Sequence, residues 1–270
     1  MKEEIVSVLL PFRQLDLYLI SAIGSILSQT YSKFELILLD SSTAESSDSL
    51  AFISKHFGLD SRIKLVKLES SLNLAEVLNH GISLSQGSYI ARMDSDDISM
   101  KERFKIQIDF LRQNPSVSVV GSAIEIIGGI PNHRLKPGAV ILAPTKEENL
   151  IHWALEKNPL FHPTALFRRE ILQIFRYNPF YELAQDYELW IRIMREFVID
   201  NIEIPLLYYR IHSAQSGVMH GIDSKYYATL AQIKHCIWVF CTFGNKAKTF
   251  RILLKKFAKL TTLFFKRHLI

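Results

Sequence analysis

Three aspartates stand within four residues, in the segment Asp94-Ser95-Asp96-Asp97. Carboxylates held this close repel one another, which raises their pKa values unless a cation neutralises them. Ligands made only of oxygen suit Mg²⁺ or Mn²⁺, ions that keep several waters and are often shared with substrate phosphates. The segment therefore predicts a divalent-metal site. The alternative is a solvated acidic turn that caps the following helix.

The acidic cluster directly follows residues 88–93, which we predict to be a strand. An apolar, β-branched run at 5–10, an apolar run at 34–39 and residues 62–68 predict three earlier strands, and apolar residues at helical spacing predict helices between them. Strands that alternate with helices form a mostly parallel sheet with helices on both faces. The sequence thus predicts an α/β fold.

Polar or turn-forming residues follow the ends of three of these predicted strands. Residues 11–13 follow the first strand, Asp40 follows the second, and the acidic cluster follows the fourth. In open sheets of this kind, ligands bind beyond the carboxyl ends of the strands. We therefore expect these three segments to meet at one ligand site.

Longer blocks of sequence add a family resemblance. In chain order they are VSVLLPF, AIGSILSQTYSKFELILLD, LNLAEVLNHGISLSQGSYIARMDSDDIS, HPT, AQDYELWIR and YRIH. With these blocks the chain resembles the inverting family-2 glycosyltransferases of the GT-A type that build bacterial cell-surface glycans. The resemblance implies a Rossmann-like sheet followed by C-terminal helices. It implies a catalytic domain over 1–222, with a nucleotide-sugar half at 1–98 and an acceptor half at 99–222. The family offers no motif for residues 223–270, which we expect to form a basic amphipathic helical tail.

The resemblance also implies roles for single residues. Asp96 would bind Mn²⁺ or Mg²⁺ together with His212, and Asp186 would be the general base that takes the proton of the acceptor hydroxyl. The acceptor side would include His162, Gln185 and Trp190. The nucleotide-sugar donor, a UDP-sugar, would contact Pro11, Phe12, Arg13, Asp40, Asn79, Arg92, Asp94, Ser95 and Arg210.

Several of these residues have a structural alternative. Asp186 could cap a helix that begins at Tyr187, and Asp97 could cap a helix that begins near Ser99. His162 and His212 could make structural hydrogen bonds only. Trp190 could pack in the core instead of against a sugar.

Two departures from the family pattern leave a second function open. Ser41 stands where the family commonly has a second acid, and Gln185 stands where a glutamate is usual. A catalytically silent homologue that binds a nucleotide sugar or a partner protein is therefore the alternative to an enzyme. A nucleotidyltransferase would need a glycine-rich and basic phosphate loop near the N-terminus, and the sequence has none.

The net charge of +5 is unevenly distributed along the chain. Residues 224–270 contain ten Lys/Arg and no Asp or Glu, which leaves 22 basic and 27 acidic residues before them. On a helical wheel, residues 246–268 separate into an apolar arc and a basic arc, the pattern of a helix that lies on an anionic membrane. Packing of the apolar arc on the catalytic domain is the alternative. We predict no nucleic-acid partner, because no recognised binding fold accompanies the charge.

The sequence shows no export signal and no run of about 18 apolar residues that could span a membrane. Its two cysteines are too few for a disulfide framework. We expect a cytoplasmic protein, peripheral on the inner face of the cytoplasmic membrane. Its expected acceptor is a growing glycan or a lipid-linked, lipopolysaccharide-type glycan.

Overall fold

The computed structural model describes residues 4–58, 60–130, 134–145, 147–213, 221–242 and 246–268. Within these ranges the strands form one sheet in the order β3-β2-β1-β4-β8-β6-β9-β5, with β7 paired to β6. The strands are β1 (Val6–Phe12), β2 (Phe34–Asp40), β3 (Ile63–Lys67), β4 (Tyr89–Arg92), β5 (Ile98–Ser99), β6 (Val117–Gly128), β7 (Val140–Ile141), β8 (Leu166–Arg168) and β9 (Val198–Ile211). The helices are α1 (Leu17–Leu27), α2 (Ser46–Phe57), α3 (Leu74–Leu84), α4 (Arg103–Gln113), α5 (Glu147–Trp153), the 3-10 turn η1 (His162–Thr164), α6 (Arg169–Ile174), α7 (Gln185–Ile193), α9 (Gly221–Thr242) and α10 (Lys246–His268).

The N-terminal half of the chain forms the parallel part of the sheet. Strands β3, β2, β1 and β4 pair in parallel, and α1, α2 and α3 connect them in sequence. Local signals fix where two of these helices begin: the Asp16 side chain caps α1, and Asn73 with Glu76 forms a capping box at α3. The predicted alternation of strands and helices is confirmed.

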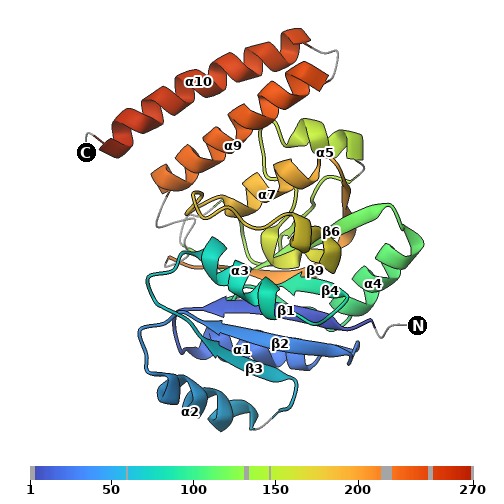
Figure 1. The fold of residues 1–270 in the computed structure, drawn as a ribbon, viewed down its shortest axis with the longest axis vertical. Coiled ribbons are helices and arrows are strands. Elements are labelled where there is room, and N and C mark those ends of the chain that lie inside the picture. The colour runs from blue at the N-terminus through green and yellow to red at the C-terminus, as the bar shows by residue number, and fades with distance from the viewer. Residues whose placement is uncertain are drawn as a thin grey trace.

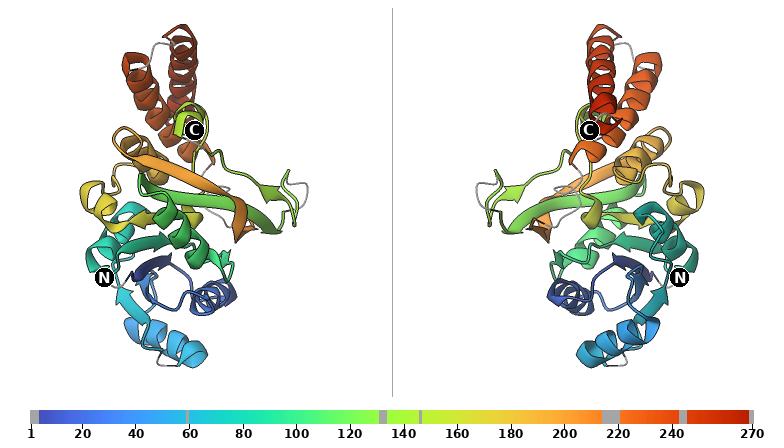
Figure 2. Two further views of the ribbon diagram at one scale, coloured as in Figure 1. Left: turned by 90° about the vertical axis from the view of Figure 1, so that its right-hand side faces the viewer. Right: turned by 90° about the vertical axis from the view of Figure 1, so that its left-hand side faces the viewer.

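The second half of the chain extends the same sheet with mixed strand directions. Strand β8 lies antiparallel between β4 and β6, and the long strand β9 runs parallel to β6. Figure 2 shows β6 and β9 running side by side and projecting from the body of the molecule. The short strand β5, which follows the acidic cluster, pairs with β9. This pairing brings the far end of β9 to the predicted metal site.

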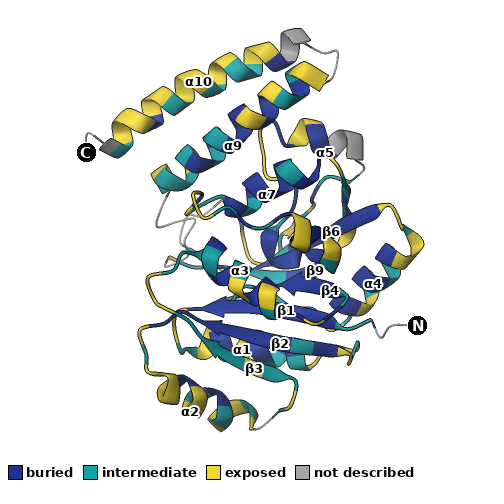
Figure 3. Ribbon diagram, in the orientation of Figure 1, coloured by how far each residue is buried: buried dark blue, intermediate teal, exposed yellow. Residues whose placement is uncertain are grey.

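Apolar side chains fill both faces of the sheet, which Figure 3 shows as buried in its central strands. Alternate residues of β1 serve opposite faces, because side chains alternate along a strand. Val8 packs with α1 and α4, whereas Leu9 packs with α3 in a second cluster that includes α7. Residues from both 1–98 and 99–222 contribute to each of these two clusters.

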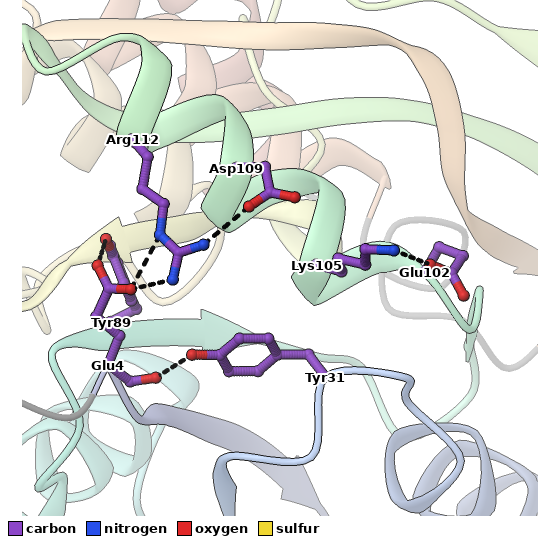
Figure 4. A network of polar contacts seen from close by, with 7 residues as sticks. All are labelled: Glu4, Tyr31, Tyr89, Glu102, Lys105, Asp109 and Arg112. Atoms are coloured by element: carbon purple, nitrogen blue, oxygen red, sulfur yellow. Dashed lines mark hydrogen bonds and ion pairs between the residues drawn. The ribbon is translucent and has the colours of Figure 1, made fainter.

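A polar network ties the start of the chain to α4 (Figure 4). Arg112 forms an ion pair with Glu4 and a second one, of 2.9 Å, with Asp109. The hydroxyl of Tyr89 donates to the Glu4 carboxylate at 3.2 Å, and the hydroxyl of Tyr31 donates to the Glu4 carbonyl. The hydrogen bond from Arg112 holds the pKa of Glu4 below its usual value. This network fixes the segment that leads into β1.

The C-terminal residues form two helices, α9 and α10, that lie side by side as a hairpin. Figure 1 shows the hairpin at one end of the molecule and α2 at the other, with α9 between α10 and α7. No helix in the described part of the chain is both long enough and apolar enough to cross a membrane. Of the turn-rich segment 128–138, residues 131–133 lie outside the described residues.

Candidate active site

The three predicted strand ends meet at one edge of the sheet. Phe12 and Asp40 are register partners at the ends of β1 and β2, and Leu9 of β1 is the partner of Arg92 at the end of β4. The backbone N–H of Met93 continues this pairing by donating to the Leu9 carbonyl at 3.0 Å. The register therefore confirms that residues 11–13, Asp40 and the acidic cluster converge.

The acidic cluster has the geometry of a cation site. One carboxylate oxygen from each of Asp94, Asp96 and Asp97 lies within 4.8 Å of the others. Asp97 is buried, and its Oδ1 accepts a 2.8 Å hydrogen bond from the backbone N–H of Arg210 on β9. Its Oδ2 is buried without a hydrogen-bond partner among the described residues. A divalent cation fits this set of oxygen ligands and would supply the missing partner.

The prediction that Asp97 caps a helix is wrong. The next helix, α4, begins only at Arg103, and its N-cap residue is Glu102. Two residues of strand β5 follow Asp97 directly. The side chain of Asp97 instead joins the acidic cluster to β9, which could not be foreseen from local spacing.

Burial and mutual repulsion make the cluster unfavourable without a cation. Burial, followed by the charges of Asp94 and Asp96, raises the pKa of Asp97 well above its usual value. Burial also raises the pKa of Asp94, although an ion pair with the buried Arg92 opposes this shift. Arg92 therefore offsets only part of the negative charge.

The end of β9 contributes a second group of side chains to the cluster. His212 Nε2 lies 2.9 Å from Asp96 Oδ2, and Arg210 Nε donates to the Asp96 carbonyl at 2.8 Å. Tyr18 of α1 packs on both residues: its ring lies 4.6 Å from the Arg210 guanidinium carbon and 5.4 Å from the His212 ring. The structure thus brings the predicted Asp96, Arg210 and His212 together. It adds Tyr18, which no motif or spacing in the sequence indicated.

Tyr18 is expected to hold Arg210 and His212 in position beside Asp96. A cation–π contact at an exposed site contributes about 0.5–1 kcal/mol, so Tyr18→Ala should weaken metal-dependent donor binding about two- to fivefold. Tyr18→Phe keeps the ring and should bind the donor as the wild type does. Calorimetric titration of the donor in Mn²⁺ checks this. Equal losses in the two variants would show that the hydroxyl, not the ring, is what matters.

Asp186, the predicted general base, lies in the first turn of α7. Its Oδ2 accepts a 2.6 Å hydrogen bond from Asn158 Nδ2. Burial raises the pKa of Asp186, and hydrogen bonds from the Tyr187 backbone and from Asn158 partly oppose this shift. The charge of Asp186 also makes a small contribution to the raised pKa of Asp94.

The N-cap of α7 is Ala184, so the alternative in which Asp186 caps the helix is wrong. Ala184 has a φ of 61° and is the only non-glycine residue of the described chain with positive φ. This left-handed conformation is costly for a residue with a Cβ atom, and such strain concentrates at functional sites. It turns the chain sharply just before Asp186.

The donor-side residues at the other strand ends are closely packed. The Asp40 side chain is fully buried and accepts hydrogen bonds from the Ser42 backbone at 2.9 Å and from Lys67 Nζ at 3.2 Å. Burial acts to raise the pKa of Asp40, but hydrogen bonds, led by those of Ser42, outweigh it and hold the pKa below its usual value. Lys67, which the sequence did not single out, also donates to the carbonyls of Ser42 and Ala44. It therefore fixes the loop after β2.

Other predicted donor residues lie around this edge. Pro11 is buried at the end of β1, Ser95 is half-buried within the cluster, and Arg13 is exposed with Nη2 donating to the Leu72 carbonyl at 2.6 Å. Asn79 of α3 exchanges two hydrogen bonds with the backbone of Tyr177, at 2.9 and 3.0 Å. Contact of these residues with a donor stays a prediction.

The predicted acceptor-side residues are largely buried. His162 Nε2 lies 2.7 Å from the Tyr177 hydroxyl, and burial lowers the pKa of His162 well below its usual value, so the ring is neutral. Gln185 is buried at the start of α7. Trp190 requires a correction: it is fully buried and stacks on Phe167 at 5.4 Å, so its ring belongs to the core.

Comparison with known proteins assigns this arrangement to a family. The family profile described as "Glycosyl transferase family 2" matches residues 7–175. The chain is 31% identical over 264 residues to the O-antigen biosynthesis glycosyltransferase WbnJ of Escherichia coli, a match that covers 88% of this chain and 96% of WbnJ. It is 29% identical over 170 residues to the amylovoran biosynthesis glycosyltransferase AmsE of Erwinia amylovora, which covers 63% of this chain and 61% of AmsE.

Solved structures share the fold at lower sequence identity. Residues 1–349 of S. aureus TarS, in complex with UDP-GlcNAc, match with a TM-score of 0.64 at 18% identity, over 97% of this chain and 72% of that one. The mannosyltransferase PcManGT of Pyrobaculum calidifontis, in complex with GDP-Man and Mn²⁺, matches with a TM-score of 0.58 at 17% identity, over 94% of this chain and 69% of that one.

Proposed function

The chain belongs to glycosyl transferase family 2 and is a glycosyltransferase with the GT-A fold, and on this premise we propose its reaction. It transfers the sugar of a nucleoside-diphosphate sugar, a UDP-sugar, to a hydroxyl of a glycan or glycolipid, with inversion at the anomeric carbon. One observation carries the proposal. One carboxylate oxygen from each of Asp94, Asp96 and Asp97 lies within 4.8 Å of the others at the end of β4, and the buried Oδ2 of Asp97 has no hydrogen-bond partner among the described residues.

The donor's diphosphate is assigned to the acidic cluster and the end of β9. Asp96 and Asp97 present carboxylate oxygens, His212 lies beside Asp96, and Arg210 offers a guanidinium for a phosphate. Mn²⁺ or Mg²⁺, when bound, supplies Lewis-acid stabilisation of the charge on the departing nucleoside diphosphate. A metal-binding mannosyltransferase of the same fold, PcManGT, supports this assignment. The nucleoside is assigned to residues 11–13, Asp40 and Asp94.

The acceptor hydroxyl is assigned to the side of Asp186. Inverting transfer requires a base that removes the hydroxyl proton while the oxygen attacks the anomeric carbon from the face opposite the leaving group. The raised pKa of Asp186 suits this task, because a carboxylate with a higher pKa is a stronger base. Asn158 orients the carboxylate by its 2.6 Å hydrogen bond.

The second part of the proposal places the enzyme on an anionic membrane through α10. One side of α10 packs inward: Leu263 is buried, and Ile252 and Leu253 pack against a small cluster that includes Cys236 and Val239 of α9. Exposed apolar and basic side chains remain on the outer side of α10: Phe250, Leu254, Phe257, Phe264 and Phe265, with Arg251, Lys255, Lys259 and Lys266. Figure 3 shows most of α10 as exposed. This pattern supports a lipid-linked glycan as acceptor and a place on the cytoplasmic face of the membrane.

Neutralising α10 is expected to release the protein from anionic vesicles. The triple variant Lys255→Gln, Lys259→Gln, Lys266→Gln should bind them at least about 100-fold more weakly, because each basic group near an anionic leaflet adds to the attraction. The matched variant Lys55→Gln, Lys64→Gln, Lys101→Gln loses the same charge from exposed sites on the catalytic domain. Co-sedimentation should show unchanged binding for this control. Equal losses in both triples would mean that net charge, not α10, holds the protein.

A panel of nucleotide sugars tests the proposed reaction. The purified protein is titrated with UDP- and GDP-sugars in Mn²⁺, Mg²⁺ or EDTA, and slow hydrolysis of each donor is followed by release of the nucleoside diphosphate. We expect one donor to bind and to hydrolyse only with a divalent ion. Absence of binding to every donor in every metal would contradict the proposal.

A further inference from the structure

An aromatic cluster joins the loop before α7 to both helices of the C-terminal hairpin. The ring of Phe180 lies 6.1 Å from that of Tyr227, in the first half of α9. Arg267, near the end of α10, places its guanidinium 5.0 Å from the ring centres of Tyr226 and Tyr227. It also forms a 2.8 Å ion pair with Asp223 at the start of α9. The loop that leads to Asp186 is thereby held beside the end of α10.

The members of this cluster differ sharply in exposure. Tyr227 and its neighbour Tyr181 are buried and anchor the loop, whereas Phe180 is 63% exposed. Large apolar side chains close to the cluster in sequence are exposed as well: Phe264 and Phe265, within a turn of Arg267, and Ile222, one turn before Tyr226. We call Phe180, Ile222, Phe264 and Phe265 the aromatic edge. Exposed apolar side chains that are fixed by buried neighbours typically mark a surface that contacts an apolar partner or a membrane interface.

We propose that the aromatic edge enters the headgroup region of the same anionic bilayer that α10 contacts. This inference rests on the membrane attachment proposed above. Aromatic side chains concentrate at membrane interfaces, where the ring meets the acyl chains while cationic neighbours meet the phosphates. The required charge is present, because Arg251, Lys255, Lys259 and Lys266 are exposed along α10 and residues 224–270 contain no acid.

The position of the aromatic edge limits the distance between Asp186 and the bilayer surface. Phe180 precedes Asp186 by six residues, a span of at most about 20 Å even for a fully extended chain. With Phe180 at the headgroups, the acceptor hydroxyl at Asp186 is within that distance of the membrane. The acceptor class is therefore a lipid-linked sugar or short glycan whose reacting hydroxyl lies close to the surface, not the distant end of a long chain.

Tryptophan fluorescence tests the position of residue 180 directly. Phe180→Trp is compared with Leu50→Trp, since Leu50 is 55% exposed on α2 at the opposite end of the molecule. Each variant is mixed with phosphatidylglycerol vesicles, with and without brominated lipids, and the wild-type emission of Trp153, Trp190 and Trp238 is subtracted. Donor hydrolysis without vesicles reports separately whether the glycosyltransferase site is intact.

We expect Phe180→Trp to shift its emission to shorter wavelength on vesicles and to be quenched by brominated lipids, and Leu50→Trp to do neither. If the Phe180→Trp protein binds the vesicles but its emission is neither shifted nor quenched, the aromatic edge does not enter the headgroup region. Attachment through α10 would still hold. If neither variant binds vesicles, both the membrane attachment through α10 and the membrane role of the aromatic edge are contradicted. Normal donor hydrolysis in that case would leave the proposed glycosyltransferase reaction intact.

A second variant connects the aromatic edge to the acceptor. Phe180→Ser should lower transfer to a lipid-linked acceptor embedded in vesicles several-fold. Transfer to a short, water-soluble acceptor should stay unchanged, because Phe180 is assigned no contact with the sugar. Equal loss with both acceptors would place Phe180 in the acceptor site itself and contradict a membrane role.

Discussion

Asp186→Asn is expected to lower sugar transfer by about 10²–10⁴-fold, the contribution of a general base. The amide has nearly the same shape as the carboxylate and can still pair with Asn158, so the fold and donor binding should be retained. Transfer to an acceptor is measured at saturating donor and metal. The control is Asp48→Asn, an exposed acid on α2 far from the cluster. A variant that kept a tenth or more of wild-type transfer would show that another group removes the proton.

The pH dependence of transfer follows from the same residue. A base must be ionised, so the rate should fall as the pH decreases through the pKa of Asp186. Because burial raises that pKa, the acidic limb should lie above pH 3.8, the ordinary value for an aspartate. The limb should be absent from the residual rate of Asp186→Asn.

Asp96→Ala is expected to abolish metal-dependent donor binding. Loss of an outer-shell partner of a metal typically costs 10–100-fold in affinity, and loss of a direct ligand should exceed about 100-fold. The removed carboxylate also leaves His212 without its partner at 2.9 Å. Manganese binding followed by electron paramagnetic resonance, and donor titration with and without EDTA, provide the measurements. Asp48→Ala, at an exposed acid of α2, is the matched control.

The opposite outcome for Asp96 would also be informative. If Asp96→Ala bound metal and donor as the wild type does, the cluster would not be the cation site. The charge of Asp97 would then have to be relieved in another way, since its Oδ2 is buried without a partner among the described residues.

Most of the parallel half of the fold could be predicted because β1, β2 and β4 are almost wholly buried and read as short, mostly apolar runs. Strand β9 could not, because residues 198–211 include Asp200, Asn201, Glu203 and Pro205 and have no simple period. Tertiary pairing with β6, through several shifts of register, decides its length.

The site was predicted where its residues are neighbours in sequence or follow strand ends, and missed where contacts join distant segments. Tyr18 meets Arg210 across almost the whole catalytic domain, and Asn158 reaches Asp186 from a separate loop. Neither contact leaves a spacing signal. Trp190 was placed on the acceptor side by its motif, but the face of α7 that carries it turns into the core.

Titration of the donor into Asp96→Ala and Asp186→Asn, side by side in Mn²⁺, tests most directly whether Asp96 binds the metal and Asp186 acts as the base. We predict that Asp186→Asn binds the donor with wild-type affinity and transfers no sugar above the reduced rate given above, whereas Asp96→Ala binds it no better than the wild type in EDTA. Equal loss of donor binding in both variants would contradict the assignment of the metal to the acidic cluster and of the base to Asp186.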